Sequence, residues 1–456
     1  MKITIIGAAG LRTPLIVKAM AARQGRINLT ELALMDIDAE RLELMAGLLS
    51  SVENGVELPF SVSLTTNADE ALQGADYVIT TFRVGGMEGR IVDERVPLAL
   101  GLLGQETTGA GGFAMAMRTI PVLLEYVSLM KKVCPEAWLI NFANPSGLLT
   151  DMLLREGGWK RTVGICDAPA TMQNVAAALL GAAPAEVFVD YFGLNHLGWV
   201  KGIFFRGVDI LPQFLKTLEQ SGGMPELPFD VSLLTELGMI PNEYLYYYYY
   251  RQQAVQLILE RGRTRGEWLK AENEALFAKL RQLRDQEDLP GMAEQYETYL
   301  RRRSQTYLLH QSGEKAGQSG VAFAASTVMG DSGYAGVALD LIEGLSGGTA
   351  KVMTVNVQNQ GAVWGMEEED VVEVPAYVHQ GLIKPLAVGN IPRHCLALMK
   401  QVKAYERLTI SAALEHSFAH ALQALTIHPL VGDVSLARQI LAGYQSGHGE
   451  LFPELH

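Results

Sequence analysis

The stretch that decides the fold is the N-terminal sequence MKITIIGAAGLRTP, residues 1–14. Lys2–Ile6 is short, rich in β-branched residues and followed by glycine, which is typical of a buried parallel strand. The run GAAG at residues 7–10 predicts a tight turn, and Pro14 suits the first turn of a helix. Glycine in such a turn lets the backbone approach a pyrophosphate, whose negative charge is favoured at a helix N-terminus.

The next strand-like segment ends in an acid, which completes the pattern of a dinucleotide-binding turn. Glu31–Met35 is apolar, and Asp36 after it could accept hydrogen bonds from both ribose hydroxyls, which favours NAD over NADP. The third glycine of the usual fingerprint is absent, and an ordinary glycine turn in an α/β protein is the alternative. The order strand, turn, helix, strand and acid favours a cofactor site. The expected cofactor-binding residues are Gly7, Ala9, Gly10, Arg12, Thr13 and Asp36.

Strand-like and helical segments alternate over the first third of the chain. Further strands are predicted at residues 76–82, 138–142 and 161–165, with a helix at residues 118–133 among the segments between them. Such alternation predicts an α/β fold with a Rossmann doubly wound parallel sheet and a ligand at the carboxyl ends of the strands. We expect this NAD-binding domain to cover residues 1–170.

The pattern changes after residue 170. Strands are predicted at residues 187–194, 198–206 and 352–357, and mostly helical segments at residues 243–285 and 393–421. Residues 289–318 are polar, with a basic cluster at residues 301–303, and could include a mobile loop. We therefore expect residues 171–456 to form an α+β domain for substrate, metal and oligomerisation, resembling the C-terminal domain of lactate and malate dehydrogenases.

Composition restricts the class of protein. The formal net charge of −13 over 456 residues argues against a nucleic-acid partner, which requires a basic footprint. No apolar run approaches the roughly 18–20 residues of a membrane span, and no signal peptide is apparent. Three cysteines cannot form a disulfide framework, so we expect a reduced, cytoplasmic compartment.

A cysteine and a histidine after strand-like segments could share a metal ion. Cys166 lies in GICDAP (residues 164–169) and His196 in GLNHLGW (residues 193–199). A thiolate and an imidazole with open positions for substrate would make a catalytic metal site. The alternatives are a buried structural cysteine and a packed histidine, and the spacing of thirty residues leaves both open.

Tyr244 is a candidate base at the start of a predicted helix. It lies in PNEYL, residues 241–245, ahead of a run of tyrosines. A tyrosine can act as a base only if a cation lowers its pKa from about 10. A packed aromatic residue is the alternative.

These residues occur in motifs that resemble glycoside hydrolase family 4, the NAD- and metal-dependent glycosidases. The resemblance covers most of the chain and is strongest in the first two hundred residues. Its most specific part is RVGGMEGRIVDERVPLALGLLGQETTGAGG, residues 83–112, which looks like the 6-phospho-β-glucosidase branch. It includes the opening turn and continues through GICDAP, GLNHLGW and PNEYL, with NFANPSG at residues 141–147 and NVQNQG at residues 356–361.

The resemblance implies a mechanism outside the two-carboxylate rule for glycosidases. In the family, NAD takes a hydride from C3 of the sugar and a metal, usually Mn²⁺, polarises the resulting ketone. A base removes the C2 proton, the C1 substituent is eliminated, water adds and the hydride returns. By position, Cys166 and His196 match the metal ligands and Tyr244 matches the base. The implied acid is Asp167, and the implied substrate-binding residues are Arg90, Asn144 and Asn195.

Three departures from the family pattern bear on the substrate. Asp167 is typical of the phospho-α-glucosidase branch, whereas the β branch more often has asparagine there. The segment RRRSQTY at residues 301–307 replaces a lysine- and glycine-rich segment common in phospho-β-glucosidases, and Tyr246 replaces an arginine. The anomer therefore stays open, as does a C6 carboxylate, a C6 sulfonate or a neutral sugar in place of a 6-phosphate.

The sequence predicts a cytoplasmic NAD- and Mn²⁺-dependent glycosidase acting on a 6-phosphorylated glucoside, as a homodimer or homotetramer without a membrane partner. One alternative is a 2-hydroxy-acid dehydrogenase of the lactate/malate type, which shares the Rossmann start but needs no metal and would produce net NADH. Another is a catalytically inactive NAD-binding sensor or scaffold. The presence of Cys166, His196 and Tyr244 together argues against that reading.

Overall fold

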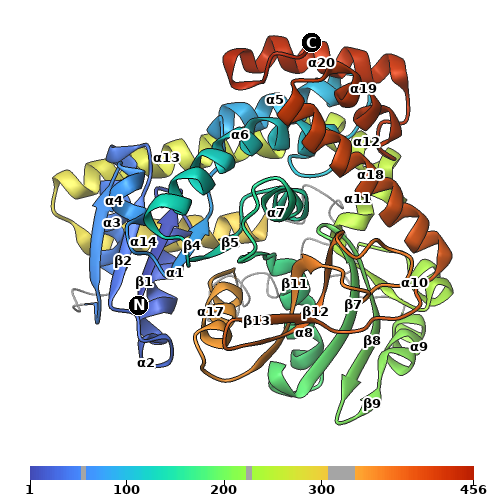
Figure 1. The fold of residues 1–456 in the computed structure, drawn as a ribbon, viewed down its shortest axis with the longest axis horizontal. Coiled ribbons are helices and arrows are strands. Elements are labelled where there is room, and N and C mark those ends of the chain that lie inside the picture. The colour runs from blue at the N-terminus through green and yellow to red at the C-terminus, as the bar shows by residue number, and fades with distance from the viewer. Residues whose placement is uncertain (53–57, 222–227, 307–333) are drawn as a thin grey trace.

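The fold is organised around one continuous sheet (Figure 1). The structure is a computed structural model that describes residues 1–52, 58–221, 228–306 and 334–456. Within these residues the sheet has 13 strands, with β9 and β13 attached beside the main order β10-β8-β7-β12-β11-β6-β5-β4-β1-β2-β3. One half of it is parallel and the other antiparallel.

The parallel half has the strand order 3-2-1-4-5-6 of dinucleotide-binding folds, as expected from the sequence. Its strands are β1 (Lys2–Ile6), β2 (Glu31–Met35), β3 (Ser61–Thr65), β4 (Tyr77–Thr80), β5 (Trp138–Asn141) and β6 (Thr162–Gly164). The central strands are apolar because helices cover both of their faces. Strand β3 was not predicted from the sequence, because its residues are polar and largely exposed at the sheet edge.

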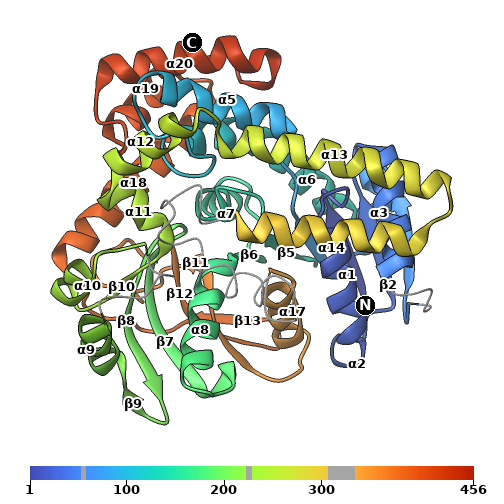
Figure 2. The ribbon, with the colours of Figure 1, turned by 180° about the vertical axis from the view of Figure 1, so that it is seen from behind.

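Helices pack on both faces of this parallel half (Figures 1 and 2). The helices are α1 (Thr13–Ala22), α2 (Gln24–Ile27), α3 (Ala39–Val52), α4 (Ala68–Leu72), α5 (Gly86–Ala99), α6 (Ala110–Val133) and α7 (Ser146–Arg155). Helices α1 and α3 contact each other on one face, and α4, α6 and α7 lie together on the other. The parallel half is therefore doubly wound.

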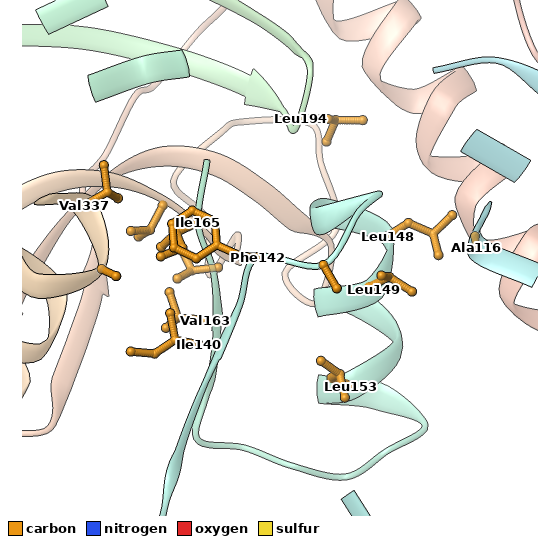
Figure 3. Close-up of a cluster of buried hydrophobic side chains, with 14 of the residues drawn as sticks. Ala116, Ile140, Phe142, Leu148, Leu149, Leu153, Val163, Ile165, Leu194 and Val337 are labelled. Carbon is orange, nitrogen blue, oxygen red and sulfur yellow. The ribbon is translucent and has the colours of Figure 1, made fainter. Parts of the chain in front are cut away.

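Figure 3 shows how α7 and the adjacent strands share the core. Ile140 of β5 lies beside Val163 of β6, its partner in the strand register. Leu148 of α7 points toward Ala116 of α6, and all four of these side chains are buried. Apolar packing thus fixes the start of α7, which begins within NFANPSG at Ser146, near the carboxyl end of β5.

The antiparallel half joins the parallel half where β11 pairs with β6. Its strands are β7 (Val187–Leu194), β8 (Leu197–Phe205), β9 (Val208–Asp209), β10 (Ile240–Pro241), β11 (Lys351–Gln358), β12 (Val371–His379) and β13 (Leu382–Pro385). Asn356 of β11 pairs with Gly164 of β6 and so joins the two halves, whereas Glu373 of β12 pairs with Gly193 of β7 within the antiparallel half. These pairs bring the β7–β8 hairpin beside the carboxyl ends of the parallel strands.

The remaining helices cover this half and extend over the first. They are α8 (Asp167–Leu179), α9 (Leu211–Ser221), α10 (Val231–Leu237), α11 (Tyr246–Tyr249), α12 (Arg251–Arg261), α13 (Arg265–Asp285), α14 (Leu289–Gln305), α17 (Tyr334–Leu345), α18 (Arg393–Glu415), α19 (Phe418–Ile427) and α20 (Val434–His448), with short 3₁₀ turns at Pro184–Glu186, Glu243–Leu245 and Gly449–Leu451. Figure 2 shows α13 and α14 lying across α3 and α1.

One expectation for this half needs revision, and another lies partly outside the described residues. Of residues 289–318, which could include a mobile loop, Leu289–Gln305 form helix α14 and residues 307–318 lie outside the described residues, so the loop stays a prediction. The single helical tail predicted at residues 393–421 is two helices, because α18 ends at Glu415 and its C-cap residue His416 has a left-handed φ of +56°.

Helix α6 is longer and more apolar than the sequence analysis allowed. By length and composition alone its 24 residues could cross a membrane. However, 61% of its most apolar window is buried inside the protein, and Arg118 near its middle is ion-paired to Asp93. This is the behaviour of a core helix.

Candidate active site

The glycine turn after β1 has the geometry of a nucleotide-binding turn. Gly7 has a φ of +94°, and a Cβ atom there would lie 2.6 Å from the backbone nitrogen of Phe82, so only glycine fits. Its N–H donates to the Met35 carbonyl at 2.9 Å, which ties the turn to β2. Helix α1 begins at Thr13, whose N–H donates to the Gly10 carbonyl at 3.0 Å.

Asp36 shapes this turn from the end of β2. Its Oδ2 accepts a hydrogen bond from the Ala9 N–H at 2.9 Å, and its Oδ1 accepts from the Asp38 N–H at 3.1 Å. The neighbouring Ile37 is 86% exposed, so an apolar side chain stands at the rim of the turn. The structure thus brings the predicted cofactor residues together, and the ribose contact of Asp36 stays a prediction.

Cys166 and His196 meet at the junction of the two halves of the sheet. Cys166 is the N-cap residue of α8, and His196 occupies the β7–β8 turn with a left-handed φ of +62°. Their Sγ and Nε2 atoms are 3.6 Å apart. For zinc, ligand bonds of about 2.3 Å to sulfur and 2.0–2.1 Å to nitrogen at a tetrahedral angle would place these atoms about 3.5 Å apart. The pair therefore fits a shared metal ion.

The environment of this pair favours the metal-binding form of the imidazole. Burial lowers the pKa of His196 to about 4, so the ring is neutral near pH 7. Its Nδ1 lies 3.1 Å from the Thr107 hydroxyl, which orients the ring. Burial also raises the pKa of the Cys166 thiol. In the part of the chain described, no group of three or more His, Cys, Asp or Glu side chains is placed to hold a metal. The pair would thus leave coordination positions for water or substrate.

Tyr244 lies directly on the candidate metal ligand. Asn242 caps the short 3₁₀ turn Glu243–Leu245, and its Oδ1 accepts from the Tyr244 N–H at 2.9 Å. The rings of Tyr244 and His196 are stacked, with centroids 3.7 Å apart and planes 9° apart. The structure therefore brings Tyr244 to Cys166 and His196, as a shared site requires.

Asp167 links the candidate metal pair to the cofactor turn. It follows Cys166 in the chain, and its Oδ1 is 3.9 Å from Sγ. Its Oδ2 lies 3.8 Å from Nη1 of Arg12, which precedes α1. Both side chains are about two-fifths exposed, so this contact is a loose one in solvent.

A buried hydrogen-bond network behind the site was missed by the sequence analysis. Glu373 accepts hydrogen bonds from Asn195 (3.1 Å), Asn356 (3.0 Å) and the Tyr191 hydroxyl (2.9 Å). The Tyr191 oxygen in turn accepts from Asn242 Nδ2 at 3.2 Å. Burial raises the pKa of Glu373 to about 7, although these hydrogen bonds act to lower it. The network joins the neighbour of His196 to the residue that caps the Tyr244 turn.

The predicted substrate-binding residues have different surroundings. Arg90 is buried and ion-paired at 2.8 Å to both Glu94 and Glu106, so its guanidinium group is held by protein carboxylates. Glu106 also pairs with Arg83. Although burial acts to raise it, these two guanidinium groups lower the pKa of Glu106 to about 2. The role of Arg90 toward substrate stays a prediction.

Asn144 and Asn195 approach the site from two different elements. Asn144 is half-buried between β5 and α7 and precedes Pro145 through a cis peptide bond. Pro145 lines a pocket together with Asn195, His196 and Glu406 of α18. Asn195 thus lies beside His196, and Asn144 adjoins the same pocket through Pro145.

The sequence matches known family models over nearly its whole length. Residues 2–182 match the family 4 glycosyl hydrolase model, and residues 191–431 match the model of the family 4 glycosyl hydrolase C-terminal domain. The chain belongs to glycosyl hydrolase family 4. The family predicted from the motifs is therefore confirmed.

Curated relatives in family 4 include phosphoglucosidases. The chain is 30% identical to a probable 6-phospho-beta-glucosidase of Bacillus subtilis, with 100% of this chain and 98% of the relative aligned. It is 31% identical to the 6-phospho-beta-glucosidase BglT of Thermotoga maritima, with 97% of each covered. A phospho-alpha-glucosidase of Clostridium acetobutylicum is 27% identical, with 100% of this chain and 99% of that protein covered.

Solved structures of family 4 members have the same fold. The Thermotoga maritima 6-phospho-beta glucosidase, solved with NAD and glucose-6-phosphate, superposes with a TM-score of 0.84 at 29% identity, covering both chains fully. A 6-phospho-alpha-glucosidase from gut microorganisms, solved with NAD and Mn²⁺, gives 0.83 at 26% identity, covering 100% of this chain and 99% of that one. Malate dehydrogenase of Cryptosporidium parvum gives 0.50 at 14% identity, covering 91% and 99%, which confirms the expected fold and nothing further.

Proposed function

We propose that this chain is an NAD- and Mn²⁺-dependent glycosidase that hydrolyses a 6-phosphorylated glucoside. The observation that carries the proposal is the 3.6 Å contact of Cys166 with His196 beneath the stacked ring of Tyr244. Membership of family 4 and relatives that are phosphoglucosidases support the same reading. A 2-hydroxy-acid dehydrogenase is disfavoured, because the likeness to malate dehydrogenase extends only to the fold.

The residues assigned to cofactor and metal fit those groups chemically. Asp36 and the turn from Gly7 to Thr13 would hold NAD, and Cys166 and His196 would hold Mn²⁺. When bound, NAD takes up the C3 hydride of the sugar and returns it, and the metal supplies Lewis acidity at the C3 oxygen. The position of Asp36 supports this assignment, since its carboxylate accepts a hydrogen bond from the Ala9 N–H and so borders the glycine turn.

Side chains beside Cys166 and His196 would carry out the proton transfers. Tyr244 would accept the C2 proton at its phenol oxygen, and its ring is held by stacking on His196. Asp167 would donate a proton to the glycosidic oxygen of the leaving group. It begins α8 one residue after Cys166, so it stands at the same edge of the site.

The 6-phosphate would be recognised by a cluster of arginines. Arg83 and Arg90 both form ion pairs with Glu106. The positive charge of Arg303, on α14, also acts to lower the pKa of Glu106. Guanidinium groups suit phosphate oxygens, and a phosphate could share these donors with Glu106. A C6 carboxylate would use the same cluster, and a neutral sugar would not.

A substrate panel tests the proposal. Aryl α- and β-glucosides, with and without a 6-phosphate, would be assayed with NAD and Mn²⁺. We expect turnover of a 6-phosphorylated glucoside that needs both additions and produces no net NADH. Net NADH formation from a 2-hydroxy acid, with no glycoside cleaved, would contradict the proposal.

We further propose that the protein is a cytoplasmic homodimer or homotetramer. All three cysteines are buried and unpaired, which suits a reducing compartment. Trp364 is 60% exposed, and we expect a subunit contact to cover it. Light scattering of the purified protein and of Trp364→Glu would report the mass, and a monomeric wild-type protein would contradict the assembly.

A further inference from the structure

Helix α14 reaches from the second half of the chain to the cofactor turn. The Tyr296 hydroxyl donates a hydrogen bond of 2.6 Å to the carbonyl oxygen of Leu11. Tyr296 is 1% exposed and Leu11 is 7% exposed, so this bond is shielded from water. Leu11 lies between Gly10 and the start of α1, where a Rossmann fold receives the pyrophosphate.

This contact is part of a separate apolar cluster. Leu44 and Leu48 of α3 pack with Phe277 of α13 and with Tyr296, away from the main core. Outside the cluster, Arg281 of α13 makes two hydrogen bonds to the Glu40 carboxylate, at 2.6 and 3.0 Å. Apolar and ionic contacts therefore dock the α13–α14 hairpin on the nucleotide-binding half. Figure 2 shows the hairpin lying against that half.

The hydrogen bond fixes the orientation of one peptide plane. In a planar trans peptide the carbonyl and the following N–H point in opposite directions. Because the Leu11 oxygen points to Tyr296, the N–H of Arg12 points away from α14. An N–H at this position, just before the first turn of α1, belongs to the donors that bind anions at a helix N-terminus.

We propose that Tyr296 is a positioning residue for NAD: through Leu11 it holds the turn at residues 10–12 in the form that binds the pyrophosphate. The inference rests on the proposed NAD site but adds a residue to it. Helix α14, which contains Tyr296, also contains Arg303, whose positive charge acts to lower the pKa of Glu106. One helix therefore contributes side chains to both the cofactor turn and the arginine cluster.

The matched pair Tyr296→Phe and Tyr299→Phe tests this role. Both tyrosines are buried on α14 in the same cluster, but the Tyr299 hydroxyl bonds Asn273 within the hairpin at 2.6 Å. Titration calorimetry without substrate should show the Kd for NAD raised about tenfold in Tyr296→Phe, because the buried Leu11 carbonyl loses its partner. The Kd in Tyr299→Phe should match wild type. Equal NAD affinity in both variants would overturn the proposal.

Fragments of the cofactor separate positioning from a general loss of structure. ADP-ribose contains the pyrophosphate, so its affinity should fall by the same factor as that of NAD. Adenosine lacks it, so its binding, followed by NMR titration, should not change. A parallel loss for adenosine would assign Tyr296 a structural role only. If the wild-type protein binds no NAD at all, the proposed function is wrong, and this result is distinct from one in which wild type and Tyr296→Phe bind NAD equally well.

A measurement on wild-type protein needs no variant. We expect NAD to slow hydrogen–deuterium exchange in residues 289–305, because binding at the turn stabilises the contact of Tyr296 with Leu11. Exchange in α9, on the other half of the molecule, is the internal control. Unchanged exchange in α14 with NAD bound would overturn the proposal independently of any substitution.

Discussion

The imidazole of His196 lies flat against the phenol ring of Tyr244, with 3.7 Å between the ring centroids. A candidate metal ligand and a candidate base are thus held by one contact, although they come from a hairpin turn and a 3₁₀ turn 48 residues apart. A cation bound by His196 would lie close to the Tyr244 ring, and positive charge there would favour the phenolate that a base requires.

We predict that Tyr244→Phe loses most of the activity, by a factor of about 10²–10⁴, because it removes the proton acceptor. Phenylalanine keeps the ring, so stacking on His196 and the affinity for Mn²⁺ should persist. Steady-state kinetics and a Mn²⁺ titration check both statements. Tyr246→Phe is the control, since Tyr246 stacks on Tyr250 instead and its loss should be tolerated. An active Tyr244→Phe enzyme would show that this side chain only packs.

We predict that Cys166→Ser and His196→Ala each abolish Mn²⁺-dependent turnover while NAD still binds. Both side chains belong to the candidate metal pair, whereas the cofactor turn is tied to β2 through Met35 and Asp36. Metal analysis and NAD titration of the purified variants separate the two effects. Normal activity together with normal metal content in Cys166→Ser would refute the metal assignment.

We predict a preference for NAD over NADP that Asp36→Asn reduces. The Asp36 carboxylate would repel a 2′-phosphate, and asparagine removes the charge but can still accept from the Ala9 N–H. The ratio of kcat/KM values for the two cofactors is the measurement. Equal use of NAD and NADP by the wild-type enzyme at low concentration would count against Asp36 as the ribose contact.

We predict that buried His428 makes the fold less stable in acid. Its Nδ1 accepts from the Leu430 N–H at 3.0 Å, and burial lowers its pKa to about 3. The unfolded chain binds a proton below pH of about 6.5, whereas the folded protein does not until about pH 3. The contribution of His428 is therefore complete above pH 6.5 and is lost as the pH falls toward 3.

Urea unfolding of wild type and His428→Asn at pH 7, 5.5 and 4.5 checks this sign. Asparagine can accept the same hydrogen bond but does not titrate. Its free energy of unfolding should therefore decline less steeply with falling pH. Parallel declines in the two proteins would contradict the role of His428.

The sequence predicted the features that depend on local pattern. The turn at Gly7 and the acid at Asp36 follow apolar strands, and strand ends in a parallel sheet meet at one edge, so their meeting was predictable. Cys166 and His196 could be proposed from motifs, but their contact depends on the single pair between β12 and β7, 180 residues apart in sequence. Local pattern carries no information on that pair.

Residues that act through long-range contacts could not be assigned. Glu373 contacts Asn195 across the sheet, and its one sequence signal is a lone acid within the buried apolar strand β12. Arg90 was assigned to the substrate from the family motif, and its ion pair with Glu106, which follows in a separate segment, could not be read from the local pattern. The first part of the polar stretch, Leu289–Gln305, forms helix α14, whose Tyr296 packs in a cluster contributed by distant helices that the local pattern does not show.

We propose that cleavage proceeds by oxidation and elimination, with Tyr244 removing the C2 proton. A direct displacement breaks only the bond at C1 and leaves the C2 hydrogen in place. The most direct test is to run the wild-type reaction in D₂O with NAD and Mn²⁺ and to examine the released sugar by NMR. We expect deuterium at C2 of the product. Full retention of protium at C2 would contradict it.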